Sequence, residues 1–187
     1  MACYPGTCLP FVTCYDPNGG STFMANILIV CTANICRSPV AEAILRDRLS
    51  NQGLDGWQVG SAGTWASAGQ LASYYSVEIM AEQDLDITGH TSKPVDDKLL
   101  GESDLILCME LGHVEALKTE FPQYTSRIYP LSEMTGQLYS IHDPYGEPRP
   151  AYEKMVAELT QLIEDGLPRI IKLARNNEEK RLDGKGD

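Results

Sequence analysis

One cysteine and one arginine, separated by five residues, lie between a short apolar run and a helical pattern, and this arrangement constrains the fold more than any other feature of the chain. Residues 26–30 read NILIV, and the next nine read CTANICRSP. A buried strand, a loop and a helix form the repeating step of a parallel α/β sheet, where ligands bind beyond the carboxyl ends of the strands. A loop of this length can turn its N–H groups toward an oxyanion. Arg37 would then hold two of the oxygens, and Cys31 would lie where the same field stabilises a thiolate.

The rest of the chain repeats this alternation of short apolar runs and longer amphipathic stretches. Strands are predicted at residues 57–61, 104–109 and 127–129, and helices near residues 38–49, 71–84, 111–121 and 152–170. Ser38 is expected to cap the first helix, with Pro39 in its first turn. Strands that alternate with helices indicate parallel βαβ units. We therefore predict a single doubly wound α/β domain, with a central four-stranded parallel sheet flanked by helices.

The two ends of the chain do not share this pattern. Residues 1–23 contain Cys3, Cys8 and Cys14 and the turn-forming segment PNGGS, so we predict a leader, a tag or a flexible extension. The cysteines could instead form a metal knuckle or a small disulfide loop, but a closed zinc site takes four ligands and no histidine is near. The folded domain is predicted to span residues 24–174, with a charged, frayed tail at residues 175–187.

Composition narrows the possible partners and the location. The 187 residues carry a net charge of −11, which argues against binding to nucleic acids or to anionic membranes. No apolar run approaches the roughly 20 residues of a membrane helix. The first 23 residues hold no lysine or arginine, unlike a signal peptide. We therefore expect a cytoplasmic protein, in a compartment that keeps thiols reduced. The three histidines show no ligand spacing, so no metal and no cofactor is expected.

Several motifs together resemble the low-molecular-weight protein tyrosine phosphatases. The loop Cys31-x5-Arg37-Ser38 near the start of an α/β domain matches the family's loop, and the segment Asp143-Pro-Tyr matches its late Asp-Pro pair. The segments SAGT at residues 61–64 and GH at residues 89–90 also stand where the family has them, so the resemblance covers residues 25–173. Ala33 departs from the glycine usual in the family. Alanine is unfavourable there only if the backbone angle φ is positive.

This resemblance implies hydrolysis of phosphotyrosine through a phosphocysteine intermediate. Cys31 is then the nucleophile, Arg37 the phosphate clamp and Asp143 the general acid and base. The implied phosphate-binding residues are Thr32, Ala33, Asn34, Ile35, Cys36, Arg37 and Ser38. The implied partner is a protein or peptide that carries phosphotyrosine, and the product is inorganic phosphate. The local sequence Asp-Pro-Tyr-Gly alone favours a β-turn role for Asp143, and only its pairing with the cysteine loop favours the catalytic role.

Other residues would support the loop. Asn34 tolerates a left-handed backbone and can hydrogen-bond within the loop. The resemblance implies that His90 orients Asn34 and that Ser61 lies near Ser38. Besides capping the helix, the Ser38 hydroxyl could donate to the Cys31 sulfur. The other two histidines are expected to be ordinary surface residues, namely His113 and His142.

Specificity is expected to come from an aromatic cleft deep enough for phosphotyrosine and too deep for phosphoserine. Trp65 and Tyr145 are the candidate walls, and Ile35 would line the floor. The related phosphoarginine phosphatases carry threonine at the position of Ile35, so the apolar residue favours phosphotyrosine. Cys36 shares the small loop with Cys31, and the two could form a reversible disulfide that protects the nucleophile from over-oxidation. The alternative for Cys36 is a small buried side chain.

Other functions remain open on this sequence. A thiol-dependent arsenate reductase of the same fold would need two more cysteines downstream, and Cys108 is the only one after the loop. Phosphoarginine hydrolysis is disfavoured by Ile35. The third alternative is a non-catalytic phosphate-binding or redox-sensing module. Such a module does not require Cys31, Arg37 and Asp143 together, so their joint presence argues against it.

Overall fold

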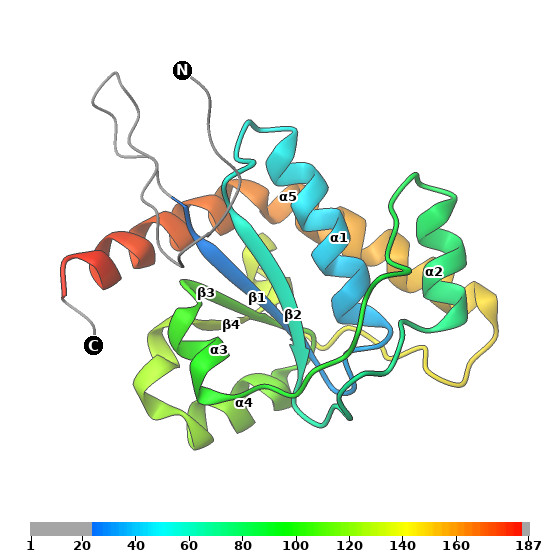
Figure 1. Cartoon of the computed structure of the whole chain (residues 1–187), viewed down its shortest axis with the longest axis horizontal. Coiled ribbons are helices and arrows are strands. Elements are labelled where there is room, and N and C mark those ends of the chain that lie inside the picture. The colour runs from blue at the N-terminus through cyan, green and yellow to red at the C-terminus, as the bar shows by residue number, and fades with distance from the viewer. Residues whose placement is uncertain (1–23, 185–187) are drawn as a thin grey trace, which may run out of the picture.

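The computed structural model describes residues 24–184, which form alternating strands and helices (Figure 1). The strands are β1 (Asn26–Cys31), β2 (Gln58–Gly63), β3 (Leu105–Cys108) and β4 (Ile128–Pro130). The helices are α1 (Arg37–Ser50), α2 (Tyr74–Ala81), α3 (Asp97–Glu102), α4 (Leu111–Glu120) and α5 (Arg149–Leu182). Two 3₁₀ turns flank β4, at Pro122–Arg127 and Leu131–Thr135.

The four strands form one all-parallel sheet in the order β2-β1-β3-β4. Strand β1 is central and pairs with β2 on one side and with β3 on the other, so the chain changes direction across the sheet at β1. Cys31 is in register with Gly63, and Val30 with Cys108. The carboxyl ends of the strands therefore meet at one edge, beside the point where the strand order reverses, which is where doubly wound sheets bind ligands. The predicted fold class is confirmed.

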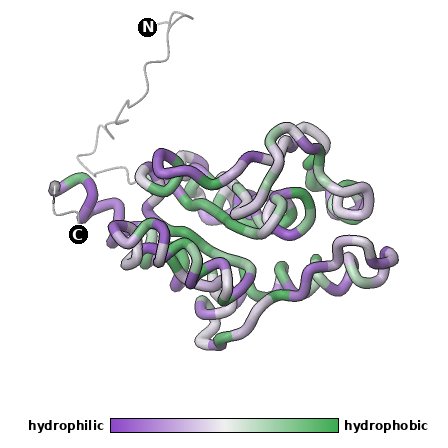
Figure 2. The backbone as a smooth tube through the Cα atoms, turned by 90° about the horizontal axis from the view of Figure 1, so that it is seen from below, coloured by the Kyte–Doolittle hydropathy of each residue, from purple (hydrophilic) through white to green (hydrophobic). Residues whose placement is uncertain are grey.

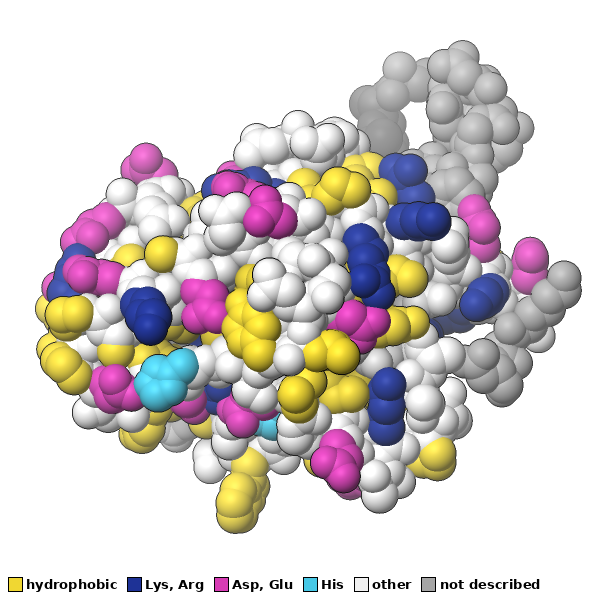
Figure 3. Space-filling model, turned by 180° about the vertical axis from the view of Figure 1, so that it is seen from behind, with side chains coloured by type: hydrophobic (Ala, Val, Ile, Leu, Met, Phe, Trp, Pro, Cys, Tyr) yellow, Lys and Arg dark blue, Asp and Glu magenta, His cyan; other side chains and the backbone are white. Residues whose placement is uncertain are grey.

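Helices cover both faces of the sheet because the strand residues alternate in direction. Ile27 and Ile29 belong to a large core that faces α1 and α5, whereas Leu28 and Val30 belong to a smaller core that faces α3 and α4. Figure 2 shows apolar stretches of backbone running through the middle of the molecule between these layers. On the rear face, lysines and arginines are interspersed with carboxylates rather than gathered in a patch (Figure 3).

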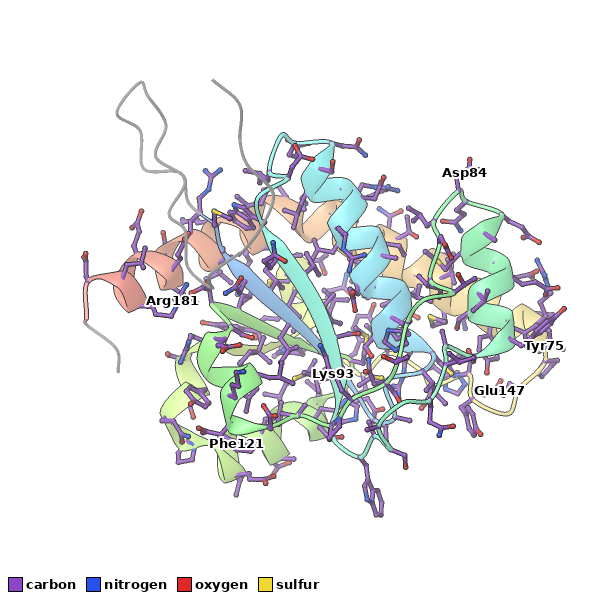
Figure 4. The ribbon with its side chains drawn as sticks, in the orientation of Figure 1. Tyr75, Asp84, Lys93, Phe121, Glu147 and Arg181 are labelled. Carbon is purple, nitrogen blue, oxygen red and sulfur yellow. The ribbon has the colours of Figure 1, made fainter. Side chains whose placement is uncertain are left out.

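Two predicted boundaries are wrong. The predicted helix over residues 71–84 is shorter and runs from Tyr74 to Ala81. The predicted frayed tail from residue 175 is wrong for residues 175–182, because α5 continues to Leu182. Charged residues suggested a solvated segment there, but Arg181 donates from Nε to the buried Asp104 Oδ1 at 2.7 Å, which fixes the last turns of α5 beside the amino end of β1 (Figure 4).

The predicted extension at residues 1–23 lies outside the described residues. Within the described part of the chain, no helix combines the length and the apolar character needed to cross a membrane. In the same residues, no cluster of three or more histidine, cysteine, aspartate or glutamate side chains has the geometry to hold a metal ion.

Candidate active site

The loop from Cys31 to Arg37 turns sharply through a left-handed residue at its centre. Asn34 has a φ of 58°, a conformation that asparagine adopts more readily than most residues. Ala33 is not among the described residues with positive φ, so alanine in place of the family's glycine carries no backbone strain. The neighbouring strand must approach closely, because a Cβ atom at Gly63 would lie 2.5 Å from the Thr32 carbonyl oxygen.

Asn34 holds this conformation through hydrogen bonds from both its backbone and its side chain. Its amide Nδ2 donates to Ser38 Oγ and to Ser61 Oγ, each at 2.8 Å, and its Oδ1 accepts the Lys93 N–H at 3.0 Å. His90 Nε2 donates to the Asn34 carbonyl at 2.7 Å. The structure thus brings the four predicted support residues together, and Lys93 joins them from the segment beside the carboxyl end of β2 (Figure 4).

Ser38 does not cap α1, so that prediction is wrong. The helix begins at Arg37, its N-cap position is Cys36, and no side chain bonds to its first N–H groups. The Ser38 hydroxyl instead lies 3.0 Å from Cys31 Sγ. Because Ser38 Oγ already accepts from Asn34, its proton is available to the sulfur. The Asn34 N–H also donates to Cys31 Sγ, at 3.2 Å, so two hydrogen-bond donors converge on the sulfur.

Arg37 is almost fully buried, and four of its five N–H bonds have partners. Nη1 donates to Glu110 Oε1 at 2.6 Å and to the Ile141 carbonyl at 2.9 Å. Nη2 donates to Asp143 Oδ2 at 2.6 Å and to Thr32 Oγ1 at 3.2 Å. Nε is buried and has no partner within residues 24–184. A buried donor without an acceptor is unfavourable, and the edge formed by Nε and Nη2 is suited to two oxygens of an oxyanion.

Five of the seven residues predicted to bind phosphate line one cavity of about 460 Å³ at the carboxyl edge of the sheet, whereas Asn34 and Ser38 are buried behind its lining. Its lining consists of Cys31, Thr32, Ala33, Ile35, Cys36, Arg37, Trp65, Ser67, Gln70, Asp143 and Tyr145. The guanidinium faces two carboxylates, so its positive charge alone does not make the cavity attractive to an anion. Within the described part of the chain, the backbone N–H groups of Ala33, Ile35 and Cys36 donate to no acceptor. An oxyanion in the cavity could therefore accept hydrogen bonds from them.

Asp143 belongs to a loop that is fastened to β3 and to Arg37. The N–H of Ile141 donates to the Met109 carbonyl at 2.8 Å, and the Ile141 carbonyl accepts from Arg37. Asp143 Oδ1 accepts the Tyr145 N–H at 3.2 Å, as in an Asx turn, while Oδ2 faces the guanidinium. Asp143 is thus both a turn residue and a carboxylate beside the thiol cavity. His142 is exposed, as expected, and contacts Glu147.

The cavity mouth is aromatic and largely open to solvent. Trp65 and Tyr145 have 87% and 68% of their surface exposed, although both line the cavity together with Ile35. The polar residues Ser67 and Gln70 complete the wall on the Trp65 side and were not predicted. The buried Ser92 holds that wall, because its hydroxyl donates to the Ser67 carbonyl at 2.6 Å and accepts the Gln70 N–H at 2.9 Å.

Sequence reasoning missed Glu110 and misread His113. His113 is not an ordinary surface residue, because its buried ring places Nε2 3.0 Å from Thr32 Oγ1 and 3.7 Å from Glu110 Oε1. Burial is the main cause that lowers the pKa of His113, and Arg37 acts in the same direction, against Glu110 and Asp143. Their position in the sequence could have indicated a role in the site, because both residues follow the carboxyl end of the buried strand β3, where ligands bind in such sheets.

Cys31 and Cys36 are both free thiols in this structure, and both line the cavity. Cys36 Sγ lies 3.8 Å from the Tyr152 hydroxyl. Burial raises the pKa of the Cys36 thiol, although hydrogen bonding to Ser73 and Tyr152 opposes this. Cys36 therefore favours the neutral thiol, unlike a nucleophile, and a disulfide between the two cysteines stays a prediction.

This arrangement defines a class of protein: a doubly wound α/β domain that presents a hydrogen-bonded cysteine, a buried arginine and a loop carboxylate in one cavity. Residues 26–179 match the family described as low molecular weight phosphotyrosine protein phosphatase. The chain belongs to this family of hydrolases.

Its relatives include phosphatases for two different phosphoamino acids. The chain is 35% identical over 144 residues to the probable low molecular weight protein-tyrosine-phosphatase EpsP of Ralstonia nicotianae, covering 77% of this chain and 94% of EpsP. It is 33% identical over 139 residues to a protein-arginine-phosphatase of Bacillus subtilis, covering 74% of this chain and 91% of the relative.

Solved structures show the same division. A low molecular weight protein tyrosine phosphatase from T. tengcongensis superposes with a TM-score of 0.74 at 35% identity, covering 78% of this chain and 99% of the other. A YwlE arginine phosphatase with a phosphorylated active-site serine superposes with a TM-score of 0.75 at 31% identity, covering 81% and 99%. Family membership alone therefore does not decide whether the substrate carries phosphotyrosine or phosphoarginine, and that choice depends on the residues that line the cavity of this chain.

Proposed function

We propose that the protein hydrolyses phosphotyrosine in proteins or peptides, with Cys31 as the nucleophile, Arg37 as the phosphate clamp and Asp143 as the general acid and base. The observation that carries the proposal is the shared cavity, which brings together a thiol with two hydrogen-bond donors, a buried guanidinium whose Nε–H has no partner in residues 24–184, and a carboxylate. No metal is needed, because the developing charge is met by N–H groups and Arg37.

In the first step the Cys31 thiolate attacks phosphorus, the S–P bond forms and the bond to the phenolic oxygen breaks. The phosphoryl oxygens would take the free Nε–H of Arg37 together with Nη2. They thereby compete with Asp143 for Nη2, since that carboxylate is bonded there at 2.6 Å. A displaced Asp143 can face the leaving oxygen and, in its protonated carboxylic acid form, give that oxygen the proton that a poor leaving group needs.

In the second step water attacks the phosphocysteine. Asp143, now ionised, accepts a proton from the water, and inorganic phosphate forms as the S–P bond breaks. Cys31 must leave as a thiolate. The Ser38 hydroxyl and the Asn34 N–H stabilise that charge, because both lie within hydrogen-bond distance of the sulfur.

The cavity lining supports tyrosine over arginine. Ile35 presents an apolar surface where the related arginine phosphatases have threonine, and Trp65 and Tyr145 offer aromatic contact to a phenyl ring. The second candidate is phosphoarginine hydrolysis. Its support is the 33% identity to the Bacillus subtilis arginine phosphatase and the two polar residues, Ser67 and Gln70, in the cavity wall.

A competition assay among matched phosphotyrosine, phosphoarginine and phosphoserine peptides tests this choice. We expect kcat/KM for phosphotyrosine to exceed that for phosphoarginine by at least about tenfold, and phosphoserine to react least. Ile35→Thr should lower the tyrosine-to-arginine ratio by about tenfold, because it removes an apolar contact and adds a hydroxyl. Leu182→Thr, at the exposed end of α5, is the matched control. A wild-type preference for the phosphoarginine peptide contradicts the proposal.

We also propose that the protein is cytoplasmic, where thiols are kept reduced, and that Cys31 and Cys36 form a disulfide when an oxidant reaches the enzyme. The disulfide would protect the nucleophile from further oxidation. Peroxide should inactivate the wild type, and a thiol reductant should restore activity. In Cys36→Ser the same treatment should become irreversible, since a lone oxidised thiol proceeds to the sulfinic acid. Cys108→Ser, in the fully buried β3, serves as the matched control. Full recovery of Cys36→Ser would exclude this pairing.

A further inference from the structure

We infer that His113 is a positioning residue of the phosphate site, which holds the Thr32 hydroxyl, and through it the Arg37 guanidinium, only while its ring is neutral. The inference rests on the phosphate chemistry proposed above, but not on the choice between tyrosine and arginine. It concerns a ring of four side chains that closes behind the catalytic cavity: Arg37, Thr32, His113 and Glu110.

Hydrogen-bond chemistry fixes the direction of one contact in this ring, and the direction of the next belongs to the inference. A guanidinium can only donate, so Thr32 Oγ1 accepts from Arg37 Nη2 at 3.2 Å. In the inferred arrangement the Thr32 hydroxyl gives its own proton to His113 Nε2, which lies 3.0 Å away and accepts it through a lone pair. The ring proton of neutral His113 accordingly lies on Nδ1, a buried atom without a partner in residues 24–184.

Protonation of His113 breaks this ring in two places. Its Nε2 becomes a donor, so the Thr32 hydroxyl can no longer donate to it. The new cation also lies 3.7 Å from Glu110 Oε1, the same oxygen that Arg37 Nη1 contacts at 2.6 Å. Arg37 therefore shares both the Thr32 hydroxyl and the Glu110 carboxylate with a second cation. Both changes loosen the guanidinium whose Nε–Nη2 edge is to hold the phosphoryl group.

The charged groups around His113 decide when this happens. Glu110 stands at the N-cap of its own helix α4, Arg37 comes from α1, and Asp143 comes from the loop after the second 3₁₀ turn. The two carboxylates raise the pKa of His113, whereas burial and Arg37 lower it, and the lowering prevails. The neutral ring is thus the form present at pH 7, and phosphate binding should weaken as the pH falls through the lowered pKa.

Two substitutions at His113 separate positioning from mere packing. His113→Leu fills the space without an acceptor, so kcat/KM at pH 7 should fall by about tenfold, the usual effect of losing one oriented hydrogen bond next to a charge. His113→Gln offers an amide oxygen to Thr32 and does not titrate. It should retain more activity than the leucine variant and should lack the histidine ionisation on the acid side of the pH profile.

Substitutions at Thr32 test whether the effect passes through the hydroxyl. Thr32→Val should reproduce the loss seen in His113→Leu, and Thr32→Ser should recover most of it. In the double variant of Thr32→Val and His113→Leu the loss should be no greater than in either single variant, because both remove the same bond. Thr119→Val, on the exposed side of α4, is the matched control for removal of a hydroxyl.

The experiment measures kcat/KM for an aryl phosphate from pH 5 to 8, and the affinity for inorganic phosphate by calorimetry over the same range. We expect phosphate affinity to follow the ionisation of His113, seen by NMR of the ring nitrogens, which also reports the Nδ1–H form. An unchanged acid limb in His113→Gln, additive losses in the double variant, or an Nε2–H ring in the wild type would overturn the inference. If no aryl phosphate is hydrolysed, the proposed function fails, while calorimetry and NMR still decide the role of His113.

Discussion

Two buried ion clusters lie at opposite edges of the sheet, and they differ in whether the central charged group has partners for its hydrogen bonds. At the amino edge, the fully buried Asp104 accepts from the Asn26 N–H at 2.8 Å and from Arg181 Nε at 2.7 Å. At the carboxyl edge, Arg37 is equally buried and contacts two carboxylates, but its Nε–H has no partner in the described chain.

The difference separates a structural cluster from a binding one. A buried charge stabilises a fold only when its hydrogen bonds are complete, because an unpaired buried polar group is unfavourable by about 1–3 kcal/mol. Asp104 meets this requirement and joins α5 to β1. Arg37 does not meet it without an added oxyanion. Changes at the carboxyl edge should therefore alter turnover more than stability, and changes at the amino edge should do the opposite.

The largest effect on turnover is expected at Cys31. Cys31→Ser should lower kcat for an aryl phosphate by at least about 10³-fold, because a serine hydroxyl is a far weaker nucleophile than a thiolate. Affinity for inorganic phosphate should persist, since the loop N–H groups and Arg37 remain. Steady-state kinetics and calorimetry measure the two quantities. Turnover close to wild type in Cys31→Ser would remove the phosphocysteine from the mechanism.

A pair of identical substitutions tests the comparison directly. Arg37→Lys keeps the charge but loses the two-pronged edge, so kcat/KM should fall by about 10²–10³-fold. Arg181→Lys should leave kcat/KM unchanged and lower the free energy of unfolding by about 1–2 kcal/mol, because Asp104 loses an oriented partner. Kinetics and urea denaturation measure both. Equal losses of kcat/KM in the two variants contradict the distinction.

Asp143 should have a smaller effect that depends on the leaving group. Asp143→Ala should lower kcat by about 10²-fold for a phosphate ester of a poor leaving group, and much less for an activated phenol that departs without a proton. A series of aryl phosphates measures this dependence. His142→Ala, which alters the same exposed loop, is the control. Equal losses across the series would assign Asp143 to the loop's turn rather than to proton transfer.

The sequence was sufficient for the features that depend on local pattern. Alternating runs predicted the parallel sheet, and the left-handed tolerance of Asn34 matched its φ of 58°. It was insufficient where a residue's role depends on distant partners. Serine is a residue type that often caps helices, yet the Ser38 hydroxyl lies within hydrogen-bond distance of Asn34 Nδ2 and Cys31 Sγ instead. His113 gives no local sign that Thr32, 81 residues earlier, lies beside it.

The same limit explains the error at the C-terminus. The charged residues of the last turns of α5 indicate solvent exposure when each is considered alone. Their partners lie at the amino edge of the sheet, where Asp104 accepts from Arg181 and Asn177 Nδ2 donates to the Asp104 carbonyl at 2.9 Å. A buried acid in one segment and a basic residue in another can be matched only once the sheet has fixed their positions.

The smallest effect is expected at Glu178, the one member of the amino-edge cluster with a buried oxygen that lacks a partner in residues 24–184. Burial raises the pKa of Glu178, and the Met24 N–H opposes this by donating to its Oε1 at 2.8 Å. With the folded pKa above the unfolded one, the folded protein holds more protons between the two values. The contribution of Glu178 to stability is therefore greatest at low pH and declines as the pH rises through that window.

Glu178→Gln removes this ionisation while keeping an oxygen for the Met24 N–H. The variant should gain stability relative to wild type as the pH rises from 4 to 8, by less than about 1 kcal/mol, with kcat/KM unchanged. Urea denaturation across this range measures the difference, with Glu179→Gln at the neighbouring exposed position as the control for the lost charge. A difference that stays constant with pH would show that Glu178 ionises as it does in the unfolded chain and would contradict this prediction.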